Sequence, residues 1–184
     1  MRRVFLLCAA VVGMTALVAG GVYFFLNIDE PSPLTLPQQE TKQEFSRQVP
    51  AGAREYISGV HHFSLLHPEY LNIEVREEGG NAMTYVFQSA ERGEGFQIFT
   101  VPYEGQQVSE AQFKKDLPSG VRTGLKNISV DGATGASFYS WDIALGETYE
   151  VWFLNNGWLY EVTTLKSLEP WLNQILQTWL FTHP

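Results

Sequence analysis

The dipeptide Asn156-Gly157 is the sequence feature that most restricts how this chain folds. Both residue types tolerate a positive φ, which a two-residue type I′ turn requires, and apolar segments flank them. The turn sets a hairpin register with two faces. One face pairs Asn155, Phe153, Val151 and Tyr149 with Trp158, Tyr160, Val162 and Thr164. The other pairs Leu154 with Leu159, Trp152 with Glu161, and Glu150 with Thr163. Because this second face is mixed, we expect it to be less deeply buried.

Further β-branched and aromatic segments, separated by glycine-rich turns, predict an antiparallel sheet. The expected strands cover residues 62–67, 72–77, 83–88, 96–101, 128–130 and 132–143. In the second of these, Ile73 and Val75 share one face because side chains alternate along a strand.

Two helices complete the predicted domain. Ser109 and Gln112 have the spacing of a capping box, which predicts a short helix that ends near Asp116, before Pro118. Ser167 is the predicted N-cap of a second helix, which accepts Pro170 in its first turn. Its apolar residues recur at three and four positions and need a surface to cover them: Leu168, Trp171, Leu172, Ile175, Trp179 and Leu180. The expected fold class is α+β, an antiparallel β-sheet flanked by helices.

An uncharged run precedes this domain, from Val4 to Leu26. As a helix it would span roughly 34 Å, enough for a hydrocarbon core of about 30 Å. Arg2 and Arg3 lie before it, so the positive-inside rule places the N-terminus in the cytoplasm and the remainder outside. We expect residues 1–27 to form an uncleaved transmembrane signal anchor in the cell membrane. The alternative is a signal peptide cleaved after Gly21, which would give a secreted protein.

Residues 28–55 are rich in proline and glutamine and predict a stalk, which leaves residues 56–184 as the domain. The chain carries a net charge of −8, and the part after the apolar run carries 20 acidic and 10 basic residues. This charge argues against a nucleic-acid partner. Cys8, the only cysteine, lies in the apolar run. A disulfide framework and a cysteine-ligated zinc site are therefore excluded from the domain.

The order of these features resembles PsbP-like domains. The resemblance covers residues 56–182 and includes an aromatic strand that runs into Pro68, the Ser109 helix, Val130-Asp131-Gly132, the Asn156-Gly157 hairpin and the closing Trp179-Leu180-Phe181. The family comprises an extrinsic protein of photosystem II and bacterial domains without an assigned function. The resemblance implies an antiparallel sheet sandwiched by helices and a non-enzymatic role.

The histidines near the start of the domain are the candidates for metal binding. Imidazole and carboxylate groups suit transition metals, and His61, His67 and Glu69 lie within nine residues. His62 is close by, but adjacent strand residues point to opposite faces, so His61 and His62 do not share a metal without distortion. The alternative is that these histidines lie partly exposed at a strand edge.

The mixed hairpin face supplies the candidates for partner binding, Trp152, Glu150 and Glu161. A tryptophan beside two carboxylates is a possible interface anchor. The alternatives are a Trp152 covered by this same domain and carboxylates on a solvated face. Diagonal neighbours lie ~7–8 Å apart, so an acid/base pair for hydrolysis is also geometrically allowed.

Motifs for nucleophilic catalysis are absent, since Gly135-Ala136-Ser137 lacks the G-x-S-x-G pattern. We therefore expect a membrane-anchored extracytoplasmic binding or assembly module with a protein partner, no catalytic activity and no cofactor. The alternative is a metal- or small-ligand-binding surface protein that uses the His61, His62, His67 and Glu69 region.

Overall fold

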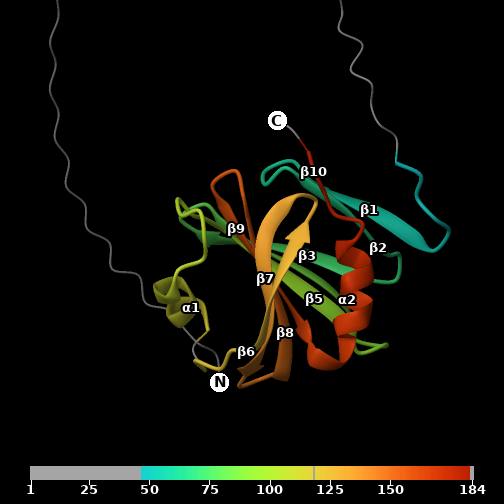
Figure 1. Ribbon diagram of the computed structural model, residues 1–184. Coiled ribbons are helices and arrows are strands. Elements are labelled where there is room, and N and C mark those ends of the chain that lie inside the picture. Colours follow the sequence, from blue (N-terminus) through green and yellow to red (C-terminus); the bar gives the residue numbers. More distant parts are fainter. Residues whose placement is uncertain (1–46, 118, 183–184) are drawn as a thin grey trace, which may run out of the picture. The chain divides into compact units, whose positions relative to one another are not determined.

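The computed structural model describes residues 47–117 and 119–182 (Figure 1). The predicted anchor and the predicted stalk up to residue 46 lie outside the described residues. Within those two ranges, no helix is long and apolar enough to cross a bilayer.

The described chain forms two antiparallel sheets and two α-helices. Three strands make a small sheet in the order β1-β2-β10: β1 (Ala53–Ser58), β2 (Phe63–Pro68) and β10 (Leu180–Phe181). Seven make a large sheet in the order β3-β4-β5-β9-β8-β7-β6: β3 (Asn72–Gly79), β4 (Ala82–Ser89), β5 (Glu94–Pro102), β6 (Thr123–Val130), β7 (Ala133–Asp142), β8 (Gly146–Asn155) and β9 (Trp158–Leu165). The helices are α1 (Glu110–Asp116) and α2 (Glu169–Leu176), with a 3₁₀ turn at Lys166–Leu168 before α2. The predicted α+β class with an antiparallel sheet is confirmed for these residues.

The hairpin of β8 and β9 has the predicted register at every pair from Tyr149↔Thr164 to Asn155↔Trp158. Asn156 and Gly157 have φ angles of 47° and 81°, as the type I′ turn requires. The turn residues therefore determine which side chains of these two central strands share a face.

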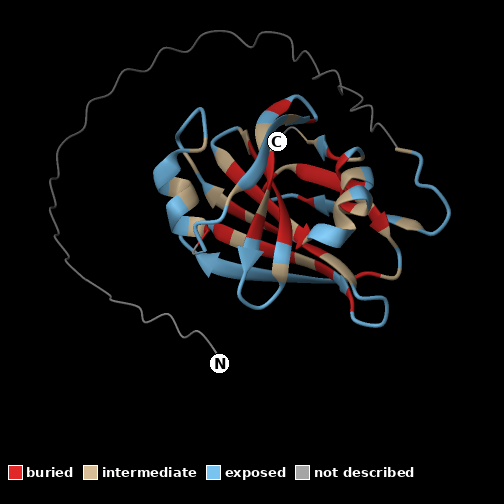
Figure 2. Ribbon diagram, turned by 60° about the horizontal axis from the view of Figure 1, so that its bottom comes forward, coloured by how far each residue is buried: buried red, intermediate tan, exposed pale blue. Residues whose placement is uncertain are grey.

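The main core lies between the large sheet and a layer made of α2 and the small sheet. It is strongly aromatic: Phe63 of β2 stacks on Trp179 at 4.4 Å between ring centroids, and Phe153 of β8 stacks on Tyr160 of β9 at 5.2 Å. Leu172, Ile175 and Leu176 form the buried side of α2. Figure 2 shows the buried residues gathered along the central strands, with exposed residues on the loops and outer strands.

The opposite face of the large sheet is covered by α1, which lies on the other side of the strands from α2 (Figure 1). Ser109 caps α1 as predicted, and its Oγ accepts a hydrogen bond from the Gln112 backbone N–H at 3.1 Å. Phe113 of α1 stacks on Trp152 at 4.9 Å. The expectation that this face is less deeply buried was wrong, because Trp152 and Leu159 are 1% and 0% exposed.

The C-terminal helix is shorter than predicted. The chain leaves α2 after Leu176, and Leu180–Phe181 pair with β2 as β10. No side chain caps the start of α2, so the predicted capping role of Ser167 is corrected. Trp179, which follows the end of the helix, stacks on Phe63.

The N-terminal limit of the folded part lies before the predicted Tyr56. β1 begins at Ala53 and pairs with β2 up to Pro68. Arg47 forms an ion pair with Glu55 at 3.6 Å, and its guanidinium donates to the backbone carbonyl of Thr178 after α2. These contacts make residues 47–55 part of the domain.

Candidate functional site

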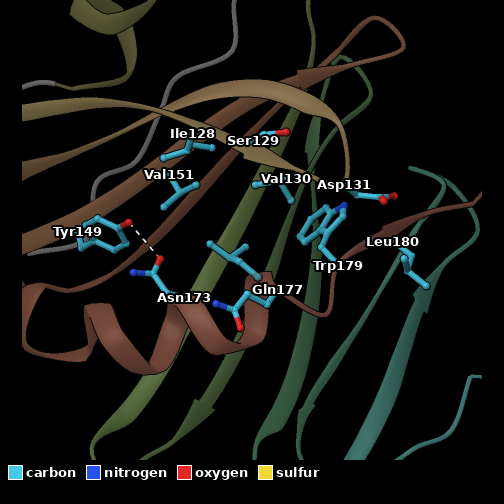
Figure 3. Close-up of a pocket in the computed structure, with 11 residues that line it drawn as sticks. Ile128, Ser129, Val130, Asp131, Tyr149, Val151, Asn173, Gln177, Trp179 and Leu180 are labelled. Carbon is cyan, nitrogen blue, oxygen red and sulfur yellow. Dashed lines mark hydrogen bonds between the residues drawn. The ribbon is translucent and has the colours of Figure 1, made fainter.

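A cleft of about 550 Å³ lies between α2 and the end of strand β6 (Figure 3). One wall comes from β6 and β8, and the other from α2 and the chain that follows it. Eleven residues line it: Ile128, Ser129, Val130, Asp131, Tyr149, Val151, Asn173, Leu176, Gln177, Trp179 and Leu180. The lining combines aliphatic side chains with hydroxyl, amide, carboxylate and indole groups, which is the usual make-up of a binding site.

Trp179 has the most deeply buried polar side chain among the residues that line the cleft. Its side chain is 2% exposed and packs against Phe63, Phe153 and Tyr160. Its indole Nε1–H is fully buried and has no hydrogen-bond acceptor among the described residues. Leaving such a donor without an acceptor costs about 1–3 kcal/mol, so an acceptor that enters the cleft as the neighbouring side chains move would be favoured at this position.

Tyr149 of β8 and Asn173 of α2 lie side by side at the end of the cleft away from Asp131 (Figure 3). The Tyr149 hydroxyl donates to Asn173 Oδ1 at 3.1 Å. This bond uses the amide oxygen, which orients the amide so that its NH₂ group serves as a donor to another molecule. Gln177, one helical turn further, adds a second amide at the exposed rim.

Asp131 is the one charged residue among those that line the cleft. It occupies a two-residue turn with Gly132, at φ angles of 44° and 80°, and its Oδ2 accepts a hydrogen bond from the Phe181 backbone N–H at 2.7 Å. The carboxylate thus ties the β6–β7 turn to β10 and gives this end of the cleft a negative charge.

The free edge of the large sheet borders the cleft, since β6 is the last strand in the sheet order. The turn at Asp131-Gly132 makes Val130 and Ala133 a hydrogen-bonded pair, and such pairs alternate along the ladder. Ile128 and Val130 therefore bond inward to β7, whereas Asn127 and Ser129 direct their backbone N–H and C=O groups away from the sheet. These outward groups are available to an added strand.

The predicted partner-binding residues lie elsewhere, beneath α1. Trp152, Glu150 and Glu161 are 1%, 5% and 6% exposed, so they are not on the protein surface. The structural alternative of a Trp152 covered by its own domain holds, because Phe113 lies over it. The sequence correctly predicted that Trp152, Glu150 and Glu161 share one face of the β8–β9 hairpin. It did not predict that α1 packs on this face.

Burial dominates the acid–base chemistry of the two glutamates. Glu150 accepts hydrogen bonds from Thr148, Thr163 and Trp152 at 2.7, 2.6 and 3.3 Å, yet burial still raises its pKa. Burial, with a smaller contribution from Asp116, raises the pKa of Glu161 to about 10. Glu161 therefore carries a proton at neutral pH, and its Oε1 has no hydrogen-bond partner within the described part of the chain.

The predicted metal candidates are held apart by separate contacts. Buried His61 bonds through Nδ1 to the Tyr85 hydroxyl at 2.5 Å and packs on Trp158 at 4.3 Å. His67 bonds to the Pro68 carbonyl at 2.9 Å, whereas Glu69 is exposed.

Burial lowers the pKa of both His61 and His67. The described residues contain no group of three or more histidine, cysteine or acidic side chains arranged to hold a metal. His62 has a φ of 50° and lies in the turn before β2.

Sequence reasoning missed the cleft because its walls come from distant parts of the chain. Trp179 was assigned to the apolar stripe of a helix. The available sequence clue was the polar pair Asn173 and Gln177, spaced by one helical turn on the last helix.

Of three comparisons with known proteins, only the one with solved structures found a similar chain. No protein-family model matches the chain, and no curated protein matches it. The chain is similar to the solution structure of cyanobacterial PsbP (CyanoP) from Synechocystis sp. PCC 6803. The two share 12% sequence identity, the match covers 72% of this chain and 94% of the other, and the TM-score is 0.49.

Proposed function

We propose that this chain is a membrane-tethered extracytoplasmic binding module without catalytic activity, and that the cleft beside β6 binds an extended segment of a partner protein. The buried indole N–H of Trp179, placed in a cleft next to a free strand edge, is the observation that carries this proposal. The tether follows from the apolar run Val4 to Leu26 and from Arg2 and Arg3 before it.

Strand addition explains why the cleft lies where it does. An extended peptide placed along β6 would bond to the outward backbone groups of Asn127 and Ser129. Because side chains alternate along a strand, every second side chain of that peptide would point toward α2. The cleft offers this side chain the aliphatic surface of Leu176 and the amide groups of Asn173 and Gln177.

The charge of the cleft selects among peptides. Asp131 is its charged lining residue, and the chain after the apolar run carries ten more acidic than basic residues. A peptide with a lysine or arginine near Asp131 is favoured over an acidic one, and its association slows as salt is added.

Site-specific photocrosslinking in native membranes tests this proposal. A photoreactive amino acid replaces Gln177 at the rim of the cleft, and a matched variant carries it at Glu77 on β3, the opposite edge of the same sheet. We expect one protein species to be joined to position 177 through a single peptide, with no such product at position 77. Equal products from both positions, or none from position 177, would contradict the proposal.

A pair of substitutions on β6 tests the binding mode. Ser129→Pro removes the outward N–H and blocks an added strand, whereas Ser129→Ala keeps this group. We expect the proline variant to lose the product at position 177 while the alanine variant retains it. Loss in both, or in neither, would mean that the edge of β6 is not used.

A further inference from the structure

The hairpin that joins β7 to β8 presents three apolar side chains to solvent. Trp141, Ile143 and Leu145 are 52%, 85% and 54% exposed, and we call them the apolar tip. Ile143 has the largest exposed fraction of the large apolar side chains in the described ranges. Single exposed apolar residues are ordinary, but three within five positions at the end of a hairpin form a patch that marks an interaction site.

Hydrogen bonds preorganise the loop of the apolar tip. The Asp142 carboxylate accepts the backbone N–H groups of Ala144 and Leu145 at 2.7 and 2.9 Å. Gly146, at a φ of 80°, then returns the chain to β8. Because the carboxylate is turned into the loop, the aliphatic side chains are displayed without a conformational cost on binding.

Of the acidic side chains around the apolar tip, Glu147 forms an ion pair and Asp142 accepts hydrogen bonds from the loop backbone. Glu147 lies across from Trp141 in the β7–β8 register, and its Oε1 is 3.0 Å from Lys166 Nζ. Residues 141–147 contain no basic side chain. Lys166 is already paired with Glu147, so an anionic surface gains little attraction here, and the acidic domain as a whole would be repelled by it.

The small size of the apolar tip favours a lipid surface over a protein as its partner. A stable protein interface buries about 800 Å² on each partner, far more than three half-exposed side chains provide. A bilayer requires less contact, because tryptophan favours the headgroup region and aliphatic side chains favour the acyl boundary below it.

We propose that the apolar tip inserts into the interfacial region of a zwitterionic bilayer, the one that holds the N-terminal tether. This proposal rests on the tether of the proposed function but not on the cleft or its peptide. Residues 27–46 reach up to roughly 65 Å when extended, against a domain diameter of roughly 37 Å. Either end of the domain can therefore contact the bilayer, and the tether raises the local concentration of the apolar tip there.

An environment-sensitive fluorophore tests the insertion in the full chain. Cys8→Ser removes the native cysteine, and Ile143→Cys carries the label. The matched control carries it at Glu77→Cys on β3. Both proteins are reconstituted in phosphatidylcholine vesicles. We expect a blue-shifted emission at position 143 that lipid-borne quenchers extinguish, and an aqueous emission at position 77. The same aqueous emission at both positions would overturn the proposal.

Two further arms separate the possible failures. Trp141→Ala with Leu145→Ser should lower the quenched fraction at position 143 roughly tenfold, because most of the remaining apolar contact is lost. Replacing half of the lipid by phosphatidylglycerol should also lower it, and a rise would contradict a zwitterionic surface. If the chain fails to float with the vesicles, the tether and the proposed function fail. If it floats with an aqueous label, only the insertion of the apolar tip fails.

Discussion

Trp152 and Trp179 show how hydrogen bonding separates a structural residue from a candidate binding residue. Both are almost completely buried, at 1% and 2% exposed. The indole N–H of Trp152 donates to Glu150 at 3.3 Å, whereas that of Trp179 has no acceptor in the described ranges. Trp152 thus completes a closed network beneath α1. Trp179 leaves a donor for a ligand in the cleft.

At this same scale, Glu161 should make the stability of the domain depend on pH. Its pKa is 4.5 in an unfolded chain and about 10 in the folded protein. The proton is held more tightly in the folded state, so its contribution is complete below pH 4.5 and is lost as pH rises toward 10. Between pH 4.5 and 7 the loss is at most about 3 kcal/mol.

Glu161→Gln should therefore flatten this dependence and raise the free energy of unfolding at pH 8. Urea denaturation at pH 5 and pH 8 measures the effect. Glu147→Gln, at an exposed position, serves as the control. A pH dependence that is unchanged in Glu161→Gln would show that this carboxyl group does not titrate as described.

Among the elements, β7 depends on a close approach to β8 at Gly135. A Cβ at this position would lie 2.6 Å from Phe153 Cβ and would also overlap the carbonyl oxygen of Trp152. Both contacts belong to the ladder of two central strands, where the backbone has little room to move.

Gly135→Ala should accordingly lower the free energy of unfolding by about 3 kcal/mol. Gly59→Ala is the matched control, because its Cβ would meet no atom within 4 Å and its φ is not positive. Thermal and urea denaturation of both variants provide the measurement. Equal stability of the two would indicate that β7 and β8 separate easily at this point.

The elements also show what sequence patterns can predict. The register of β8 and β9 and the capping of α1 by Ser109 followed from residues close to one another. The exposure of β3 could not be predicted from its own residues. Ile73 and Val75 share a face as predicted, but they are 39% and 43% exposed. Alternation tells which side chains share a face, but it does not tell whether another element covers that face.

For the whole molecule, the contacts of Arg47 and β1 set where the folded part begins. Arg47 reaches the carbonyl of Thr178, across 131 positions of the sequence, and β1 forms one edge of the small sheet. The small sheet in turn covers part of the main core. Residues before Tyr56 therefore contribute to the stability of the entire domain.

A fragment of residues 45–184 should unfold in one cooperative transition with the stability of the domain in the full chain. A fragment of residues 56–184 should be less stable by about 2 kcal/mol or more, because it lacks half of β1 and the Arg47 contacts. Urea denaturation followed by circular dichroism compares the two fragments. Equal stability would place the limit of the domain at Tyr56 after all.

The sequence by itself determined the antiparallel sheet, the β8–β9 register and the first helix, because turn chemistry, alternation and capping act between residues near in the chain. Only the tertiary structure decided that Trp152 is buried, that the chain turns back after Leu176, and that Asn173, Trp179 and β6 enclose a cleft. These features arise where α1 and α2 pack on opposite faces of the sheet and bring distant residues together, such as Phe113 and Trp152, which are 39 positions apart. Packing across such separations depends on the shapes of whole elements, which no local pattern records.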